Sequence, residues 1–203
     1  MMDSSDSYKT IKSEVEHEIK IKGSKFIGRT FSCTSEETAE NHLAQIRKKY
    51  YDATHHCYAY RVGLGNEAKF RYSDDGEPNG TAGKPIYDRI TGKDLTDVLI
   101  VVTRYFGGTK LGTGGLTHAY SDSAGEVIEK GGVATKYLTE RISITVAFSD
   151  YSAVERLIHQ YEAIVLRSDF AENVSLEIEL RLSKIEALKN DLIELTSGRI
   201  KIG

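Results

Sequence analysis

The chain has 203 residues, with 27 Lys and Arg against 30 Asp and Glu, a formal net charge of -3, two Cys and no Trp. A hydrophobic fraction of 39% and a charged fraction of 28% are typical of a globular protein of one or two domains. A net charge near zero excludes a generally basic nucleic-acid binder, so any binding of nucleic acid has to be local.

The sequence also argues against membrane insertion and secretion. The longest aliphatic stretch, Val98–Val102, is far shorter than the roughly 20 apolar residues of a membrane-spanning helix, and we predict a buried strand there. The first ten residues, MMDSSDSYKT, lack the basic and apolar segments of a secretory signal, so we expect a cytoplasmic protein. Cys33 and Cys57 lie far apart without a CxxC pair, which argues against a disulfide framework or a zinc site of the usual spacing.

Glycine and charge divide the chain near Tyr137. Of the 18 glycines, 14 fall between Gly63 and Gly132. Residues 1–137 carry 19 basic and 19 acidic side chains, whereas residues 138–203 carry 8 basic and 11 acidic ones. We therefore predict two domains, 1–137 and 138–203, with the acidity confined to the second.

The first domain is predicted to be of mixed α+β class, with helices packed on one side of a sheet. A hairpin turns at Lys22-Gly23-Ser24, and a capping box of Thr34 and Glu37 opens a helix. The remaining predicted elements are strands at 55–62 and 69–73, a Gly-rich loop and short helix over 74–91, a strand over 97–105, a second Gly-rich loop, and a helix from about 116 to 130.

The second domain has clear periodicities. Apolar residues alternate over 142–148 and again over 174–182, which predicts two half-buried strands. A helix follows a cap at Ser149 or Asp150, a strand covers 163–167, and a capping box of Ser183 and Glu186 opens a second helix before a last strand at 199–202. The order β-α-β-β-α-β is the ferredoxin-like arrangement.

The strongest chemical signal is Val101–Leu116, in which a buried strand leads through five glycines in nine residues into a helix. Glycines let backbone N–H groups turn toward a ligand, and the first helical turn offers unpaired N–H groups at the positive end of the dipole. Arg104 and Lys110 would add full charges. The sequence fits neither the P-loop nor the GxGxxG pattern, and a tight strand-to-helix corner explains the glycines equally well.

The second signal is the loop Ser73–Pro85, which contains three carboxylates in four residues and both prolines. Asp74, Asp75 and Glu77 could hold Mg²⁺ together with a ligand phosphate. Turn chemistry, in which Asp accepts hydrogen bonds from its own downstream backbone, is the favoured interpretation.

Two further clusters carry less weight. His55, His56 and Cys57 are adjacent, and structural packing is favoured over a zinc site because no local residue completes a ligand set. Tyrosines interleaved with arginines in the first domain could stack on unpaired bases, although partly buried tyrosines explain the pattern better. The open sheet face of the second domain lacks aromatics and leans acidic, so a protein or a basic surface suits it better than RNA bases.

Three segments together, His55–Tyr60, Asp74–Pro85 and Val101–Tyr120, resemble the IMPACT family, in its YigZ-like bacterial branch. The resemblance implies a first domain similar to the second domain of ribosomal protein S5, and a ferredoxin-like second domain akin to the last domain of elongation factor G. Eukaryotic relatives act in translational control through an extra N-terminal domain for which this chain has no room. The family usually has a basic residue after Gly-Leu, where this chain has Thr117 and His118, so the anion contact would be weaker or dependent on pH.

We therefore expect a non-enzymatic, translation-linked binding protein with no cofactor and no metal. Its groove between the two Gly-rich loops would bind a phosphate-bearing partner such as RNA, a ribosomal component or a translation factor. The alternatives are a small-molecule phosphate or nucleotide enzyme that uses the same loops, and a pure protein-interaction module. The predicted anion- or nucleic-acid-binding residues are Asp75, Glu77, Gly80, Thr81, Gly83, Lys84, Arg104, Tyr105, Gly107, Gly108, Lys110, Gly112, Gly114, Gly115 and His118.

Overall fold

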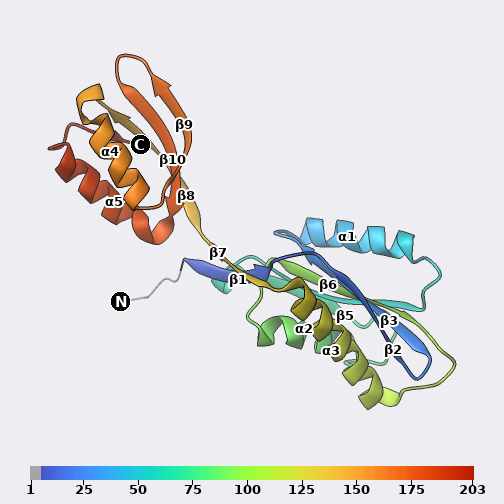
Figure 1. Cartoon of the computed structure of the whole chain (residues 1–203). Coiled ribbons are helices and arrows are strands. Elements are labelled where there is room, and N and C mark those ends of the chain that lie inside the picture. Colours follow the sequence, from blue (N-terminus) through green and yellow to red (C-terminus); the bar gives the residue numbers. More distant parts are fainter. Residues whose placement is uncertain (1–5) are drawn as a thin grey trace. The chain divides into compact units, whose positions relative to one another are not determined.

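The computed structural model describes residues 6–203, and residues 1–5 of the predicted first domain lie outside the described part. The chain forms two compact units (Figure 1). One unit is Tyr8–Lys136, and the other is Tyr137–Gly203 together with residues 6 and 7. Within residues 6–203, no helix combines the length and the hydropathy that crossing a bilayer requires.

The first unit is built on a five-stranded sheet with the order β2-β3-β6-β4-β5, in which all neighbours are antiparallel. The strands are β2 (Glu16–Ile21), β3 (Ser24–Ser32), β4 (His55–Val62), β5 (Lys69–Ser73) and β6 (Val98–Tyr105). A short β1 (Ser7–Ile11) pairs with β7 (Val133–Tyr137) in a separate two-stranded sheet. The positions of β4 and β5 agree with the sequence prediction, because each is a short run of β-forming residues between turn signals.

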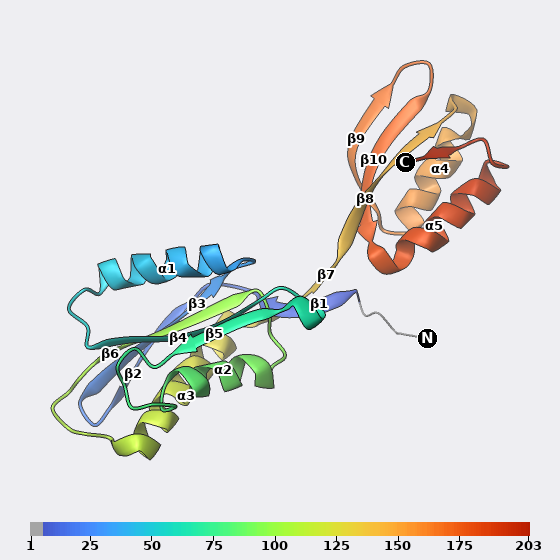
Figure 2. The same cartoon turned by 180° about the vertical axis from the view of Figure 1, so that it is seen from behind.

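Helices cover both faces of this sheet, so the prediction of helices on one side is wrong. Helix α1 (Glu36–Lys49) lies on one face, and α2 (Gly83–Gly92) and α3 (Gly112–Gly131) lie on the other (Figures 1 and 2). Successive residues of β6 enter different cores, since Val98 and Ile100 pack with α2 and α3 whereas Leu99 packs with α1. A strand that is apolar at every position is buried on both faces.

The two predicted capping boxes are also wrong. Ser35 rather than Thr34 caps α1, and its side chain accepts a hydrogen bond from the backbone N–H of Thr38. Ser183 lies inside α5 (Leu182–Leu195) instead of preceding it, and its hydroxyl donates to Asp6. At both helix starts the neighbouring polar residues give similar local signals, so the sequence places the cap only to within one or two residues.

The second unit has the predicted order β-α-β-β-α-β. Its elements are β8 (Thr139–Val146), α4 (Phe148–Gln160), β9 (Ile164–Phe170), β10 (Val174–Arg181), α5 and β11 (Lys201–Ile202). The antiparallel sheet has the order β11-β8-β10-β9, so β9 forms one edge. Alternate residues of β8 and β10 are buried and form one core with residues of α4 and α5, which include Val154 and Leu188.

The connection from β5 to α2 is organised by Asp74. Its carboxylate accepts hydrogen bonds from the backbone N–H groups of Gly80, Ala82 and Gly83 at 2.8 to 2.9 Å. These donors include the first residue of α2, so the carboxylate accepts hydrogen bonds from backbone N–H groups that the helix itself leaves unpaired. It also lies at the positive end of the helix dipole. The turn interpretation of this loop is therefore confirmed for Asp74.

We expect Asp74→Ala to destabilise the first unit by about 2 kcal/mol, because three backbone donors lose their acceptor. Asp88→Ala is the matched control. Asp88 lies on the same helix, and among residues 6–203 its carboxylate pairs only with the exposed Lys84, so its loss should cost less than about 0.5 kcal/mol. Urea unfolding followed by circular dichroism measures both variants. Equal stabilities for the two variants would contradict the capping role.

Candidate functional site

The second Gly-rich segment begins with a close contact between two backbones. A Cβ added at Gly107 would lie 1.9 Å from the carbonyl carbon of Gly23, in the turn between β2 and β3. The backbone N–H of Gly107 donates to the hydroxyl of Ser24 at 3.2 Å. Only glycine permits this approach, so Gly107 serves to hold the end of β6 against the hairpin turn.

Helix α3 begins at Gly112, four residues earlier than the sequence predicts. Gly112, Gly114 and Gly115 therefore form its first turn and not the preceding loop. The N-cap residue Leu111 has an apolar side chain and accepts no hydrogen bond from the backbone N–H groups of this turn. The first turn thus presents backbone N–H groups at the positive end of a 20-residue helix.

The base of the site is a buried ion pair between Arg104 on β6 and Glu77 in the first Gly-rich loop. Arg104 Nη1 donates to Glu77 Oε1 at 2.5 Å, and only 6% and 4% of the two side chains are exposed. Arg104 Nη2 donates to Ser24 Oγ at 3.2 Å, whereas the buried Nε has no hydrogen-bond partner among the described residues. Two of the five N–H donors of the guanidinium are thus used inside the protein.

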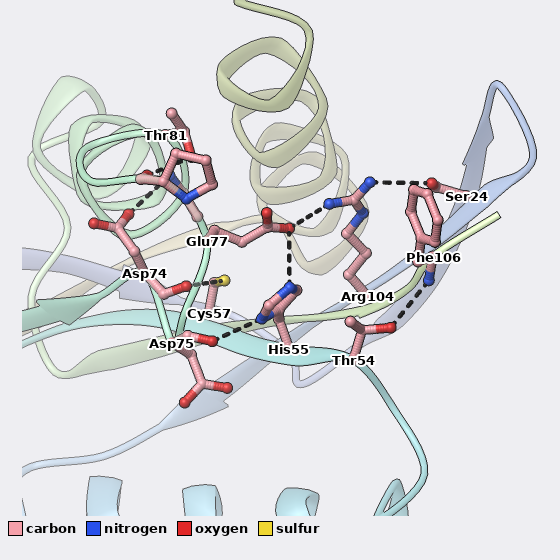
Figure 3. A network of polar contacts seen from close by, with 12 residues as sticks. Ser24, Thr54, His55, Cys57, Asp74, Asp75, Glu77, Thr81, Arg104 and Phe106 are labelled. Carbon is pink, nitrogen blue, oxygen red and sulfur yellow. Dashed lines mark hydrogen bonds and ion pairs between the residues drawn. The ribbon is translucent and has the colours of Figure 1, made fainter. Parts of the chain in front are cut away.

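Three further side chains surround Glu77. The hydroxyl of Tyr120 on α3 donates to Glu77 Oε1 at 2.7 Å. His55 Nε2 on β4 lies 3.9 Å from the same oxygen (Figure 3). The Cys57 thiol donates to the backbone carbonyl of Asp74 at 3.0 Å. Burial raises the pKa of the Cys57 thiol and of the Tyr120 hydroxyl, so both stay protonated near neutral pH. Neither group is therefore an activated nucleophile.

A cavity of about 350 Å³ lies above this pair, between the two Gly-rich segments. We call it the loop groove. Its walls are mostly apolar, with Phe106 stacked near the Arg104 guanidinium at 5.6 Å. Lys110 is exposed at the wall, and among residues 6–203 no carboxylate lies within ion-pair distance of its amine. The lining residues are Glu77, Pro78, Arg104, Phe106, Lys110, Leu111, Gly112, Thr113 and Leu116.

The structure brings together four of the predicted site residues in the loop groove: Glu77, Arg104, Lys110 and Gly112. The others lie outside its lining. The exposed His118 belongs to α3, and Lys84 forms an ion pair with Asp88. The remaining residues outside the lining are Asp75, Gly80, Thr81, Gly83, Tyr105, Gly107, Gly108, Gly114 and Gly115.

Several of these residues have partners within the protein. The Asp75 carboxylate accepts from the backbone N–H of His56 at 2.6 Å, and the Thr81 hydroxyl donates to the carbonyl of Pro78 at 2.7 Å. The Tyr105 hydroxyl donates to Asp52 at 2.7 Å. A Cβ at Gly83 would lie 2.7 Å from backbone atoms of Ser73, so that glycine allows α2 to approach β5. These residues shape the loops around the groove.

Sequence reasoning missed the apolar walls of the loop groove and the residues that hold its base. Phe106 directly precedes Gly107, and an aromatic residue beside a Gly-rich loop was the available signal. Ser24 is 80 residues from Arg104, and no local pattern links the two. Within the described part of the chain, no group of three His, Cys, Asp or Glu side chains is arranged to hold a metal ion.

Comparison with known proteins agrees with the resemblance drawn from the motifs. A family model described as the Impact N-terminal domain matches residues 22–128, and a domain of unknown function, DUF1949, matches residues 144–199. The IMPACT family member YvyE of Bacillus subtilis is 34% identical, over 97% of this chain and 90% of the relative. The IMPACT family member YigZ of Escherichia coli is 30% identical, over 90% of each chain.

A solved structure gives the same result at the level of the whole chain. It is titled "Crystal structure of an hypothetical protein", is 28% identical, and matches with a TM-score of 0.67 over 97% of this chain and 96% of its own. Sequence and fold therefore agree over nearly the full length, and the chain belongs to the IMPACT family.

Proposed function

We propose that this chain is a cytoplasmic, non-enzymatic binding protein linked to translation, and that its loop groove binds a phosphate-bearing partner such as RNA or a ribosomal component. One observation carries the proposal. The exposed Lys110 and the uncapped first turn of α3 meet at the same cavity, above the buried Arg104–Glu77 pair.

The positive end of α3 supplies the anion-binding part of the argument. Backbone N–H groups in a first helical turn, together with the helix dipole, favour a phosphate or carboxylate. The start of α2 differs, because the Asp74 carboxylate already occupies it. Lys110 adds a full charge beside α3, at the wall of the groove.

The apolar walls of the loop groove suit the remainder of such a ligand. Phe106 has 48% of its surface exposed, and Pro78 and Leu111 stand beside it in the lining. An aromatic ring next to a phosphate site stacks on unpaired bases in many proteins that bind single-stranded RNA. The groove thus combines a face for a base with a site for its phosphate.

The link to translation rests on the family and not on the geometry of the groove. The resemblance implies translational control for eukaryotic members, and family membership supports a link to translation for this chain, without the mechanism that the resemblance assigns to their extra N-terminal domain. The strand order of the second unit supports a ferredoxin-like fold, and the five-stranded sheet with three helices is compatible with the second domain of ribosomal protein S5. The polar open face of the second unit would take a protein partner.

Gly114→Asp tests the groove without disturbing the fold. A Cβ at Gly114 meets nothing within 4 Å, and the residue lies in the first turn of α3. The new carboxylate should stabilise the helix slightly, while it occupies the first-turn N–H groups and repels phosphate. We expect crosslinking to RNA and cosedimentation with ribosomes to fall about tenfold.

Gly114→Ala is the matched control, because it fills the same space without charge and should bind like the wild type. Lys110→Ala should give an intermediate loss of binding. Equal crosslinking and equal cosedimentation for Gly114→Asp, Lys110→Ala and the wild type would exclude the loop groove as the binding site.

We expect Arg104→Ala to lower the stability of the fold, whatever its effect on ligand binding. Removing one partner of a buried ion pair leaves the Glu77 charge uncompensated, and we expect a loss of about 3–5 kcal/mol in the free energy of unfolding. Urea unfolding of the full chain measures it. A change below about 1 kcal/mol would show that the pair does not hold the site together.

The alternative function is that of an enzyme acting on a small-molecule phosphate or a nucleotide. The volume of the groove, about 350 Å³, is within the range of pockets that bind small molecules. A thermal-shift series with nucleotides and Mg²⁺ separates the two functions. A ligand at 100 times its Kd stabilises the protein by about 2.7 kcal/mol. We expect no such stabilisation by mononucleotides at about 1 mM, and a full shift with any of them would favour the enzyme.

A further inference from the structure

At one edge of its sheet, the second unit has an exposed and largely apolar strand. β9 (Ile164–Phe170) is the edge of its sheet and pairs only with β10 among the described residues. All seven of its residues are exposed, and the apolar ones include Ile164 at 63% and Phe170 at 53%. An edge strand of this kind presents a row of unpaired backbone N–H and C=O groups to any strand that can lie beside it.

Natural edge strands carry Lys, Pro, an inward-pointing charge or a β-bulge, each of which opposes pairing with another strand. β9 has one of these protections: a shift in its register with β10 leaves Leu166 without a partner residue on that strand, whereas Arg167–Phe170 pair regularly. β9 contains neither Lys nor Pro, and its two charges, Arg167 and Asp169, are of opposite sign. Within residues 6–203, neither charge lies within ion-pair distance of a partner. The strand is neutral overall, and its charges are free to pair outside the unit.

The order of residues along β9 is complementary to itself. If two copies pair antiparallel about a two-fold axis at Ser168, Arg167 of one copy lies opposite Asp169 of the other. The axis generates this ion pair twice. In the same register Leu166, the residue at the register shift of β9, lies opposite Phe170, again twice. Opposite charges and apolar pairs directly across two strands each stabilise the pairing.

Residues beside the strand extend the apolar surface. Phe148 and Tyr151, at the start of α4, lie with ring centres 6.4 and 5.5 Å from that of Phe170. Phe148 is itself 53% exposed. An exposed aromatic cluster that adjoins an unpaired edge is typical of an interaction surface.

We propose that β9 pairs with β9 of a second copy of this chain, antiparallel and centred on Ser168, so that the two four-stranded sheets become continuous. The occupant is a second copy because the one register at Ser168 satisfies both charges and both apolar positions through a single two-fold axis. A strand from an unrelated protein would need a matching charge order of its own.

Ser168→Cys tests the register. Cα atoms opposite each other across antiparallel strands are close enough for a disulfide, so two copies should crosslink under mild oxidation. The native Cys33 and Cys57 are buried and do not interfere. Ser175→Cys is the matched control, because Ser175 is also exposed but lies on β10, which pairs on both sides. We expect a crosslinked dimer for Ser168→Cys and monomer for Ser175→Cys.

Charge exchange tests the chemistry of the same contact. Arg167→Asp places like charges opposite each other and should weaken self-association about tenfold, as measured by sedimentation from about 1 μM to about 1 mM. The double variant Arg167→Asp with Asp169→Arg restores both ion pairs and should restore self-association. A wild-type chain that stays monomeric to about 1 mM, equal crosslinking of the two Cys variants, or no rescue by the double variant would each overturn the proposal.

Discussion

The buried ion pair between Arg104 and Glu77 is the constraint on which the first unit's candidate site depends. It joins β6 to the loop after β5, and through Ser24 and Tyr120 it reaches the β2–β3 turn and α3. Two charges that are almost fully removed from water hold only where their geometry is complete. The position of the loop groove therefore follows from an interaction at its base and not from the glycines alone.

The two Gly-rich segments are similar in sequence, but the helix that follows each segment begins differently in the structure. Asp74 supplies the acceptor for the start of α2, so that helix end is complete within the chain. Within the described part of the chain, no side chain caps the start of α3, and Lys110 adds positive charge beside it. Of the two helix ends, only that of α3 is left for an external anion, and the anion-binding hypothesis narrows to this end of the groove.

Local patterns predicted the elements well and their ends less well. The runs that became β8 and β10 were evident from period-two alternation, because a half-buried strand leaves that pattern in sequence. β4 and β5 were evident as short runs of β-forming residues between turn signals. The start of α3 was placed four residues late, because glycines signal a loop while the packing of Leu116 and Tyr120 extends the helix backward. The doubly covered sheet was also missed, although β6 is apolar at consecutive positions.

The sequence by itself determined the order of elements, the segregation of glycine and acidity between two halves of the chain, and the family, since all three depend on residues near one another along the chain. Only the tertiary structure decided that Glu77 neutralises Arg104, that Phe106 and Pro78 line the loop groove, and that β9 lies at the edge of its sheet. The contacts responsible join residues 27 to 80 positions apart in the first unit, and no local periodicity records which distant side chains meet when chain segments pack.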